Sequence, residues 1–461
     1  MVHDFRESWG EVLTFVDEAI QSLAQISLSP GGREFLNGLE RGEAGLCIEL
    51  MDRGLAKDSL DQTTRQSFLI VLIELAKHRR RLPDSIMITE KTMAAEKAHT
   101  SGGLWEVRRG TSNNSAIAIK TPKFTTTKDV EKIRDQFCRE VILWNSLSHP
   151  NVLKLAGVLG SIDTFNFSTV SEWMTHETIM KYTETNKANR LGLLHGVAQG
   201  LKYMHDSNLV HGNIRATNIL IANESPPRAC LSGFGFISVP EEEHPASEAP
   251  DTSQGVKWRY LAPELIHPSR FGLKFVKSSK EADVYAFGLL VLEVLSGKVP
   301  FHGTKGVHLV CSIVNGTRPT KPKNATMIDL SDPMWELLQA CWDGDRLQRP
   351  RMQHVEVQIG NAAVRWESSM TAVPFPRRPG VSPSSLLMGS SNPSSTGTRS
   401  SNASDPPRLD IPDIRVNVVG PEENNSDGMQ EFYPTPSPIS PRQPEGHTNE
   451  TIINRLDGVG P

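Results

Sequence analysis

The sequence has few cysteines and no long apolar run. Its five cysteines lie far apart, and no two of them form a Cys-x-x-Cys pair. We therefore expect reduced thiols rather than a disulfide framework or a zinc site. The most apolar run, 68–75, is interrupted by Glu74 and is too short to cross a bilayer, so no transmembrane segment is expected.

Strong charge bias is also missing. The net charge is −4 with 22% charged residues, which gives no indication of binding to nucleic acid or to an acidic membrane. The first residues lack the basic and apolar regions of a signal peptide. We therefore expect a cytoplasmic protein that does not bind nucleic acid.

The chain of 461 residues is too long for one core, and its pattern changes twice. From Phe5 to about Leu82, apolar residues recur every three or four positions, as in amphipathic helices. We predict a helical N-terminal domain over 1–85 that binds protein partners, followed by a linker over 86–98. The basic run 78–81 suits the negative end of a helix dipole better than it indicates a binding site.

The last part of the chain is rich in Ser, Pro, Asn, Gly and Thr and has no apolar periodicity. It cannot bury enough surface to offset its chain entropy, so residues 368–461 are predicted to be disordered. Three Ser/Thr-Pro pairs lie at 435–441. They suit proline-directed phosphorylation, and a plain low-complexity linker explains them equally well.

The middle of the chain carries an ordered set of motifs. His211-Gly212-Asn213 is followed after four residues by Asn218 and an apolar strand, and Trp258 to Glu264 ends in Ala-Pro-Glu. This order resembles the protein kinase superfamily, in particular its tyrosine-kinase-like branch. The resemblance covers 99–367. It implies an α+β, bilobal fold with a five-stranded N-lobe and a helical C-lobe, preceded by an all-α bundle and followed by the disordered tail.

The resemblance also assigns a nucleotide site. Lys120 ends an Ala-Ile-Lys strand like the one whose lysine binds ATP phosphates, and Glu140 stands where the family places its helix partner. Ser171 matches the gatekeeper position before the hinge. The residues that the resemblance places around the nucleotide are Gly102, Val107, Ala118, Lys120, Glu140, Glu172, Met174 and Asn218.

Three departures from the family pattern affect catalysis. Asn213 replaces the catalytic aspartate, and an amide cannot accept a proton at neutral pH. Gly233 replaces the metal-binding aspartate of the Asp-Phe-Gly segment, which leaves Asn218 as a poor magnesium ligand. Trp105 replaces a glycine of the phosphate loop, where an indole would crowd or cap the phosphate site. ATP is therefore expected to bind weakly and with little dependence on magnesium.

Residues of the C-lobe keep the pattern of the family. By resemblance, Glu264 pairs with Arg349, and Asp283 caps the backbone of the catalytic loop. These residues hold the lobe together, and the C-lobe is also expected to offer a surface to protein partners.

Three functions are compatible with these motifs. The first is a pseudokinase that acts as a signalling scaffold or allosteric regulator. The second is an active Ser/Thr or Tyr protein kinase with an atypical mechanism. The third makes the helical N-terminal domain an effector that the kinase-like domain switches. Loss of a general base alone lowers rates by about 10²–10⁴-fold, which favours the first.

Overall fold

The computed structural model describes residues 2–57, 59–88, 94–100, 105–123, 130–164, 166–186, 188–240, 257–274 and 278–371. Gly102 and nearly all of the predicted disordered tail lie outside these ranges. Within the described ranges, none of the helices combines the length and the apolar character that crossing a membrane requires.

The N-terminal part is helical, as its periodicity predicts. Local sequence defines where two of its helices begin. Glu40 and Glu43 form a reciprocal capping box, and the Asp61 carboxylate accepts hydrogen bonds from the backbone N–H groups of Thr63 and Thr64. The helices are α1 (Val2–Leu28), α2 (Gly32–Gly38), α3 (Arg41–Leu55) and α4 (Gln62–Arg79).

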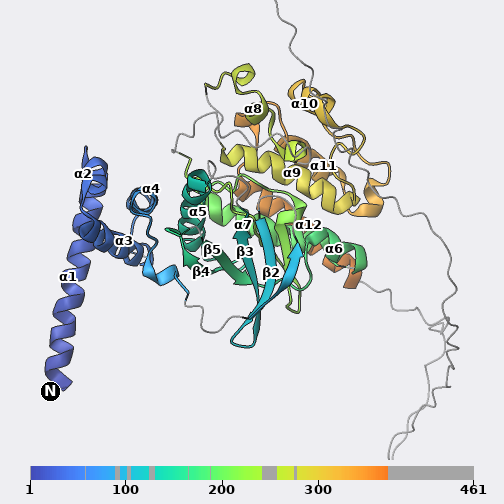
Figure 1. The fold of residues 1–461 in the computed structure, drawn as a ribbon. Coiled ribbons are helices and arrows are strands. Elements are labelled where there is room, and N and C mark those ends of the chain that lie inside the picture. The colour runs from blue at the N-terminus through green and yellow to red at the C-terminus, as the bar shows by residue number, and fades with distance from the viewer. Residues whose placement is uncertain are drawn as a thin grey trace, which may run out of the picture. The chain divides into compact units, whose positions relative to one another are not determined.

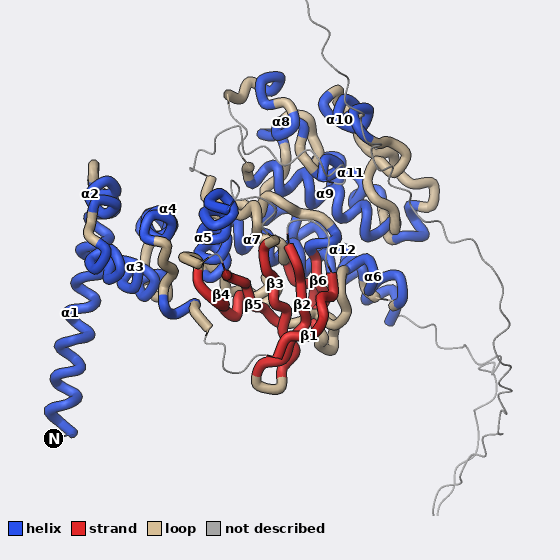
Figure 2. The backbone as a smooth tube through the Cα atoms, viewed as in Figure 1, coloured by secondary structure: helices blue, strands red, loops and turns tan. Residues whose placement is uncertain are grey.

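An antiparallel five-stranded sheet of order β1-β2-β3-β5-β4 forms the N-lobe (Figure 2). One long helix, α5 (Val130–Asn145), lies beside it (Figure 1). In β3 the side chains alternate, so that Ile117 and Ile119 pack with Val170 on one face and Lys120 points to the other. The strands are β1 (Ala94–Thr100), β2 (Trp105–Ser112), β3 (Ser115–Pro122), β4 (Leu155–Ser161) and β5 (Asn166–Glu172).

The C-lobe is mainly helical and is built around α9 (Lys280–Ser296). Ser279 caps the start of α9, Gly297 ends it with a left-handed φ of 70°, and fourteen consecutive residues between them are buried. This arrangement of two lobes confirms the fold that the motifs imply. The other elements are α6 (Ile179–Thr185), α7 (Arg190–Asp206), β6 (Ile219–Ala222), β7 (Arg228–Leu231), α8 (Pro263–Ile266), α10 (Gly306–Val314), α11 (Asp332–Cys341) and α12 (Met352–Thr371).

The chain between the helical part and the N-lobe contains ordered structure. A 3-10 turn covers Asp84–Ile86, and Met87 forms a parallel bridge with Val158 of β4. The Ile88 N–H donates to the Val158 carbonyl over 2.8 Å. Strand β1 begins at Ala94, inside the range predicted as a linker. Its sequence carries no alternating apolar pattern, so periodicity did not indicate a strand here. The predicted domain boundaries themselves stay predictions.

Candidate nucleotide and catalytic site

The catalytic-loop segment is held by one buried carboxylate. Asp283, in the first turn of α9, accepts hydrogen bonds from the backbone N–H groups of His211 and Gly212, both over 2.8 Å. The ring of His205 lies 3.1 Å from the same carboxylate. The predicted cap on the loop backbone is therefore confirmed, and it fixes the position of the next residue, Asn213.

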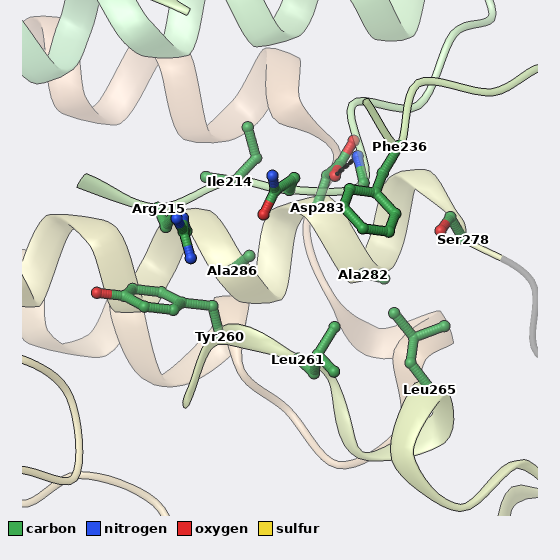
Figure 3. Close-up of a pocket in the computed structure, with 12 residues that line it drawn as sticks. Ile214, Arg215, Phe236, Tyr260, Leu261, Leu265, Ser278, Ala282, Asp283 and Ala286 are labelled. Carbon is green, nitrogen blue, oxygen red and sulfur yellow. Dashed lines mark hydrogen bonds between the residues drawn. The ribbon is translucent and has the colours of Figure 1, made fainter. Parts of the chain in front are cut away.

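Asn213 lies in the catalytic-loop segment of the C-lobe, near the start of α9. Its N–H donates to Nδ1 of His211 over 3.2 Å, and its carbonyl accepts from the Asn218 amide over 2.8 Å. It lines a cavity of about 30 Å³, which has Arg215 and Tyr260 at one end (Figure 3). Asn213 can orient a hydroxyl group in this position, but it offers no base.

Lys120 and Glu140 form the predicted ion pair between β3 and α5. The Lys120 ammonium lies 2.9 Å from the Glu140 carboxylate, which is almost fully buried. The same ammonium lies 4.2 Å from the centroid of the Trp105 indole, a distance typical of a cation–π contact. Trp105 therefore covers the cation that meets the phosphates of ATP in kinases.

Gly233 adopts a backbone conformation that excludes most side chains. Its φ is 80°, and a Cβ atom here would lie 2.6 Å from Cγ of Asn218. Asn218 itself is fixed by its bond to the Asn213 carbonyl. No group of three or more His, Cys, Asp or Glu side chains suited to a metal is found in the described part of the chain. Gly233 offers no side-chain oxygen at the position where the kinase family has its metal-binding aspartate, and the weak magnesium site stays a prediction.

The remaining predicted nucleotide residues lie on neighbouring strands. In the antiparallel sheet, Val107 pairs with Lys120, and Ala118 pairs with the buried gatekeeper Ser171. Glu172 ends β5, and the buried Met174 follows two residues later. The fold thus gathers strands β2, β3 and β5 at one site, and the nucleotide-binding role of these residues stays a prediction.

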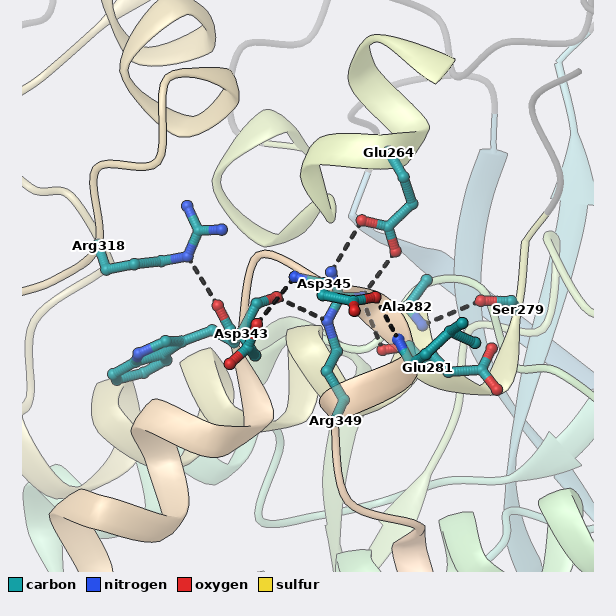
Figure 4. Close-up of polar contacts among 10 residues, drawn as sticks. Glu264, Ser279, Glu281, Ala282, Arg318, Asp343, Asp345 and Arg349 are labelled. Carbon is teal, nitrogen blue, oxygen red and sulfur yellow. Dashed lines mark hydrogen bonds and ion pairs between the residues drawn. The ribbon is translucent and has the colours of Figure 1, made fainter. Parts of the chain in front are cut away.

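A second ion pair, Glu264 with Arg349, is buried and fully hydrogen-bonded. The guanidinium donates two bonds to the carboxylate, of 2.6 and 2.8 Å, and further bonds of 3.0 Å to the carbonyls of Glu281 and Asp343 (Figure 4). The predicted pairing is confirmed. Because both partners are buried and fully bonded, its role is to join α8 to the loop before α12.

The motifs did not indicate a buried polar cluster behind Asn213. The Tyr260 hydroxyl donates to the Glu293 carboxylate over 2.6 Å, and burial raises the pKa of that carboxyl group. Arg215 is close enough for its charge to favour the ionised Glu293, while burial lowers the pKa of its own guanidinium. The three residues come from distant segments, so no spacing in the sequence could have revealed the cluster.

The comparisons with known proteins agree with this geometry. A family model described as protein tyrosine and serine/threonine kinase matches residues 93–359. Ephrin type-A receptor 5 of Gallus gallus is 29% identical over 262 residues, which is 55% of this chain and 24% of the receptor.

Two further relatives match the same region. Ephrin type-A receptor 8 of Rattus norvegicus is 29% identical over 266 residues, which is 56% of this chain and 65% of the relative. The serine/threonine-protein kinase STY46 of Arabidopsis thaliana is 26% identical over 287 residues, which is 59% of this chain and 46% of the relative. The matches thus span between about a quarter and two thirds of these relatives. Since the family model covers more than half of the chain, the chain belongs to the protein tyrosine and serine/threonine kinase family.

Proposed function

We propose that the kinase domain of this protein is a pseudokinase that serves as a signalling scaffold or allosteric regulator. The main support for the proposal is Gly233, which lacks a metal-binding carboxylate and leaves little room for a larger side chain beside Asn218. The backbone at Gly233 disfavours an aspartate, and a side chain there would require Asn218, the other metal-linked residue, to shift from its bond to the Asn213 carbonyl. Asn213 adds the loss of the base, which acts on the same transition state.

The residues around the predicted nucleotide site favour weak binding of ATP. In kinases, apolar walls and hinge backbone contact adenine, and the pairing of β2, β3 and β5 brings the predicted residues onto neighbouring strands. The phosphates meet a lysine that Trp105 covers and a site without a metal carboxylate. We therefore expect adenosine to bind about as well as ATP, with little effect of magnesium.

Phosphate transfer is the first test. Purified full-length protein is incubated with labelled ATP and magnesium or manganese, beside a Lys120→Met control. We expect no transfer above that control, and no gain in either Asn213→Asp or Gly233→Asp. Robust transfer by the wild type that Lys120→Met abolishes would overturn the proposal.

Ligand binding is the second test. A ligand that binds only the folded protein raises the melting temperature by mass action. Titrations with adenosine, and with ATP in the presence and absence of magnesium, should give similar small shifts. A large shift that appears only with ATP and magnesium together contradicts the proposed loss of the metal site.

The proposal includes an intracellular setting and protein partners. The helical N-terminal part and the C-lobe surface are the regions that we assign to such partners. A pseudokinase needs them because its output is binding rather than catalysis.

A further inference from the structure

Helix α5 is buried on the side that faces away from the nucleotide site. Glu131, Cys138 and Ile142 recur at intervals of seven and four residues, so they share one face of the helix, opposite Glu140. Cys138 and Ile142 are 0% and 3% exposed. A helix that is apolar and buried on both faces requires a partner on each side.

The partner on the outer side is α4, which contacts α5 directly and is drawn next to it in Figure 1. Leu69 and Ile73 are four residues apart on one face of α4, and both side chains are buried. Arg80 follows the last residue of α4. The Arg80 guanidinium lies 3.4 Å from the Glu131 carboxylate. One face of α4 therefore packs on the outer face of α5.

Charges and a further hydrogen bond agree with this pairing. The positive charge of Lys77, one turn beyond Ile73, acts on the Cys138 thiol, whose pKa burial nonetheless raises to about 12. At the start of α4, the Gln62 amide donates to the Asp206 carbonyl at the end of α7 over 3.1 Å. The same face of α4 thus contacts both lobes.

The opposite face of α4 belongs to the helical bundle. The Ser67 hydroxyl donates to the Ser27 carbonyl over 2.9 Å, and Arg79 donates to the Asn37 carbonyl over 3.0 Å. Phe68 lies against Gly54 of α3. Because α4 is packed on both sides, any movement of α4 with the bundle removes the cover from α5.

A second junction lies beside the first. Ile88 hydrogen bonds to Val158 of β4, and a Cβ atom at Gly157, whose φ is 150°, would meet the Ile88 side chain at 2.5 Å. The segment after α4 is thus seated closely on the sheet, and it limits how α4 can move.

We infer that the four N-terminal helices are a built-in partner of α5, which hold it where Glu140 meets Lys120 and transmit binding events at the bundle to the nucleotide pocket. In kinases the position of this helix decides whether the lysine and glutamate pair. Here a buried interface within the chain fixes that position. The inference does not depend on whether the domain transfers phosphate.

Cutting the chain tests the interface. A site-specific protease sequence is inserted between Ile88 and Ala94 of the full-length protein, which is then cleaved in its native state. We expect the two fragments to co-elute in size-exclusion chromatography. Separation of two fragments that both keep their helical circular dichroism would overturn the inference.

A pair of matched variants tests the transmission to α5. Ile73→Asp places a charge in the interface, whereas His78→Asp places the same charge on an exposed position of the same helix. Hydrogen exchange of peptides from 130–145 and alkylation of Cys138 should accelerate roughly tenfold or more in Ile73→Asp and stay unchanged in His78→Asp. Release of the bundle without faster exchange in α5 contradicts the inference.

The state of the Lys120–Glu140 pair can be measured without a nucleotide. If α5 moves, Lys120 loses its partner, so its acetylation by an amine-reactive reagent should rise several-fold in Ile73→Asp. Should that variant fail to fold, Arg80→Glu leaves the apolar contacts intact and opposes Glu131 by like charge. It should raise Cys138 alkylation roughly threefold, and an unchanged rate counts against the interface.

Discussion

The pairs Glu264–Arg349 and Lys120–Glu140 each join a carboxylate to a cation, but they differ in how completely they are closed. In the first, the side chains are 3% and 0% exposed and both carboxylate oxygens are bonded. In the second, Lys120 is 26% exposed, and one oxygen of Glu140 has no hydrogen-bond partner among the residues that the structure describes. The first pair is fully hydrogen-bonded, whereas the second is only partly bonded and is accessible to solvent at Lys120.

The same difference separates the two regions around them. Residues that fix backbone, such as Asp283 and Arg349, keep the family pattern and its geometry. Trp105, Asn213 and Gly233 depart from that pattern at positions that the resemblance assigns to phosphates, the substrate hydroxyl and the metal. A chain that needs the fold but not the reaction can lose the second group without cost to stability.

The largest loss of stability is expected when the buried Glu264–Arg349 pair is broken. Arg349→Met leaves a buried carboxylate unpaired, which should lower the free energy of unfolding by about 3–5 kcal/mol. Lys120→Met also leaves a buried carboxylate, but Lys120 is 26% exposed, so water can reach the vacated position and the loss should be smaller, about 1–2 kcal/mol. Chemical denaturation of both variants measures the difference. Equal losses would remove the distinction between the two pairs.

A side chain at position 233 should lower the free energy of unfolding by more than its backbone conformation alone explains. Gly233→Ala is compared with Gly272→Ala, which has a similar φ of 72° but open space around it. The left-handed conformation costs each variant about 1 kcal/mol, and the contact with Asn218 should add about 1 kcal/mol to the first. Asn218→Ala should relieve that addition. Identical losses in the two alanine variants contradict the predicted contact.

Acidification should weaken the catalytic loop through His211. Burial lowers the pKa of its ring from the usual 6.5, and the charges of Asp283 and the bond to the Ser232 carbonyl only partly oppose this. The unfolded chain therefore binds the proton first, so this contribution is complete above pH 6.5 and declines as the pH falls toward the lowered pKa.

The expected loss is up to about 1.4 kcal/mol per pH unit for this one group. Unfolding free energies measured from pH 7.5 to 5 should fall more steeply in the wild type than in His211→Gln. Such a result would place His211, like Asp283, among the residues that fix the backbone. Parallel curves for the two proteins would show that His211 does not contribute.

The smallest effect should appear at Trp105. Removing the indole from Lys120 with Trp105→Gly should tighten ATP by about 1 kcal/mol, roughly fivefold in Kd, because the ammonium becomes free for phosphate. Adenosine has no phosphate, so its affinity should hardly change. Calorimetric titration of both ligands checks this, and an equal gain for adenosine would show that the indole blocks the adenine slot instead.

Motif spacing predicted the parts of the site that the fold must bring together. The pairs of Lys120 with Glu140 and of Glu264 with Arg349, and the cap by Asp283, follow from their places in the ordered motifs. These contacts depend on the fold as a whole, and the order of motifs specifies that fold. The five-stranded sheet and the helical C-lobe were predictable for the same reason.

Contacts made by replaced or unrelated residues could not be predicted in this way. Periodicity indicated that α4 has a buried face, but it does not name the surface that covers it, here α5. The left-handed φ of Gly233 and the stacking of Trp105 on Lys120 depend on local backbone geometry. The sequence did hold one unused signal: Phe68 to Ile73 is apolar without interruption, which indicates burial on both sides of a helix.

The bridge between Met87 and Val158 also affects how the protein behaves in solution. In the order β1-β2-β3-β5-β4, strand β4 is an edge, and an open edge invites pairing with another chain. The segment at Met87 and Ile88 occupies that edge. A fragment that begins at the N-lobe would therefore expose both a strand edge and the apolar outer face of α5, and it should aggregate where the longer chain stays monodisperse.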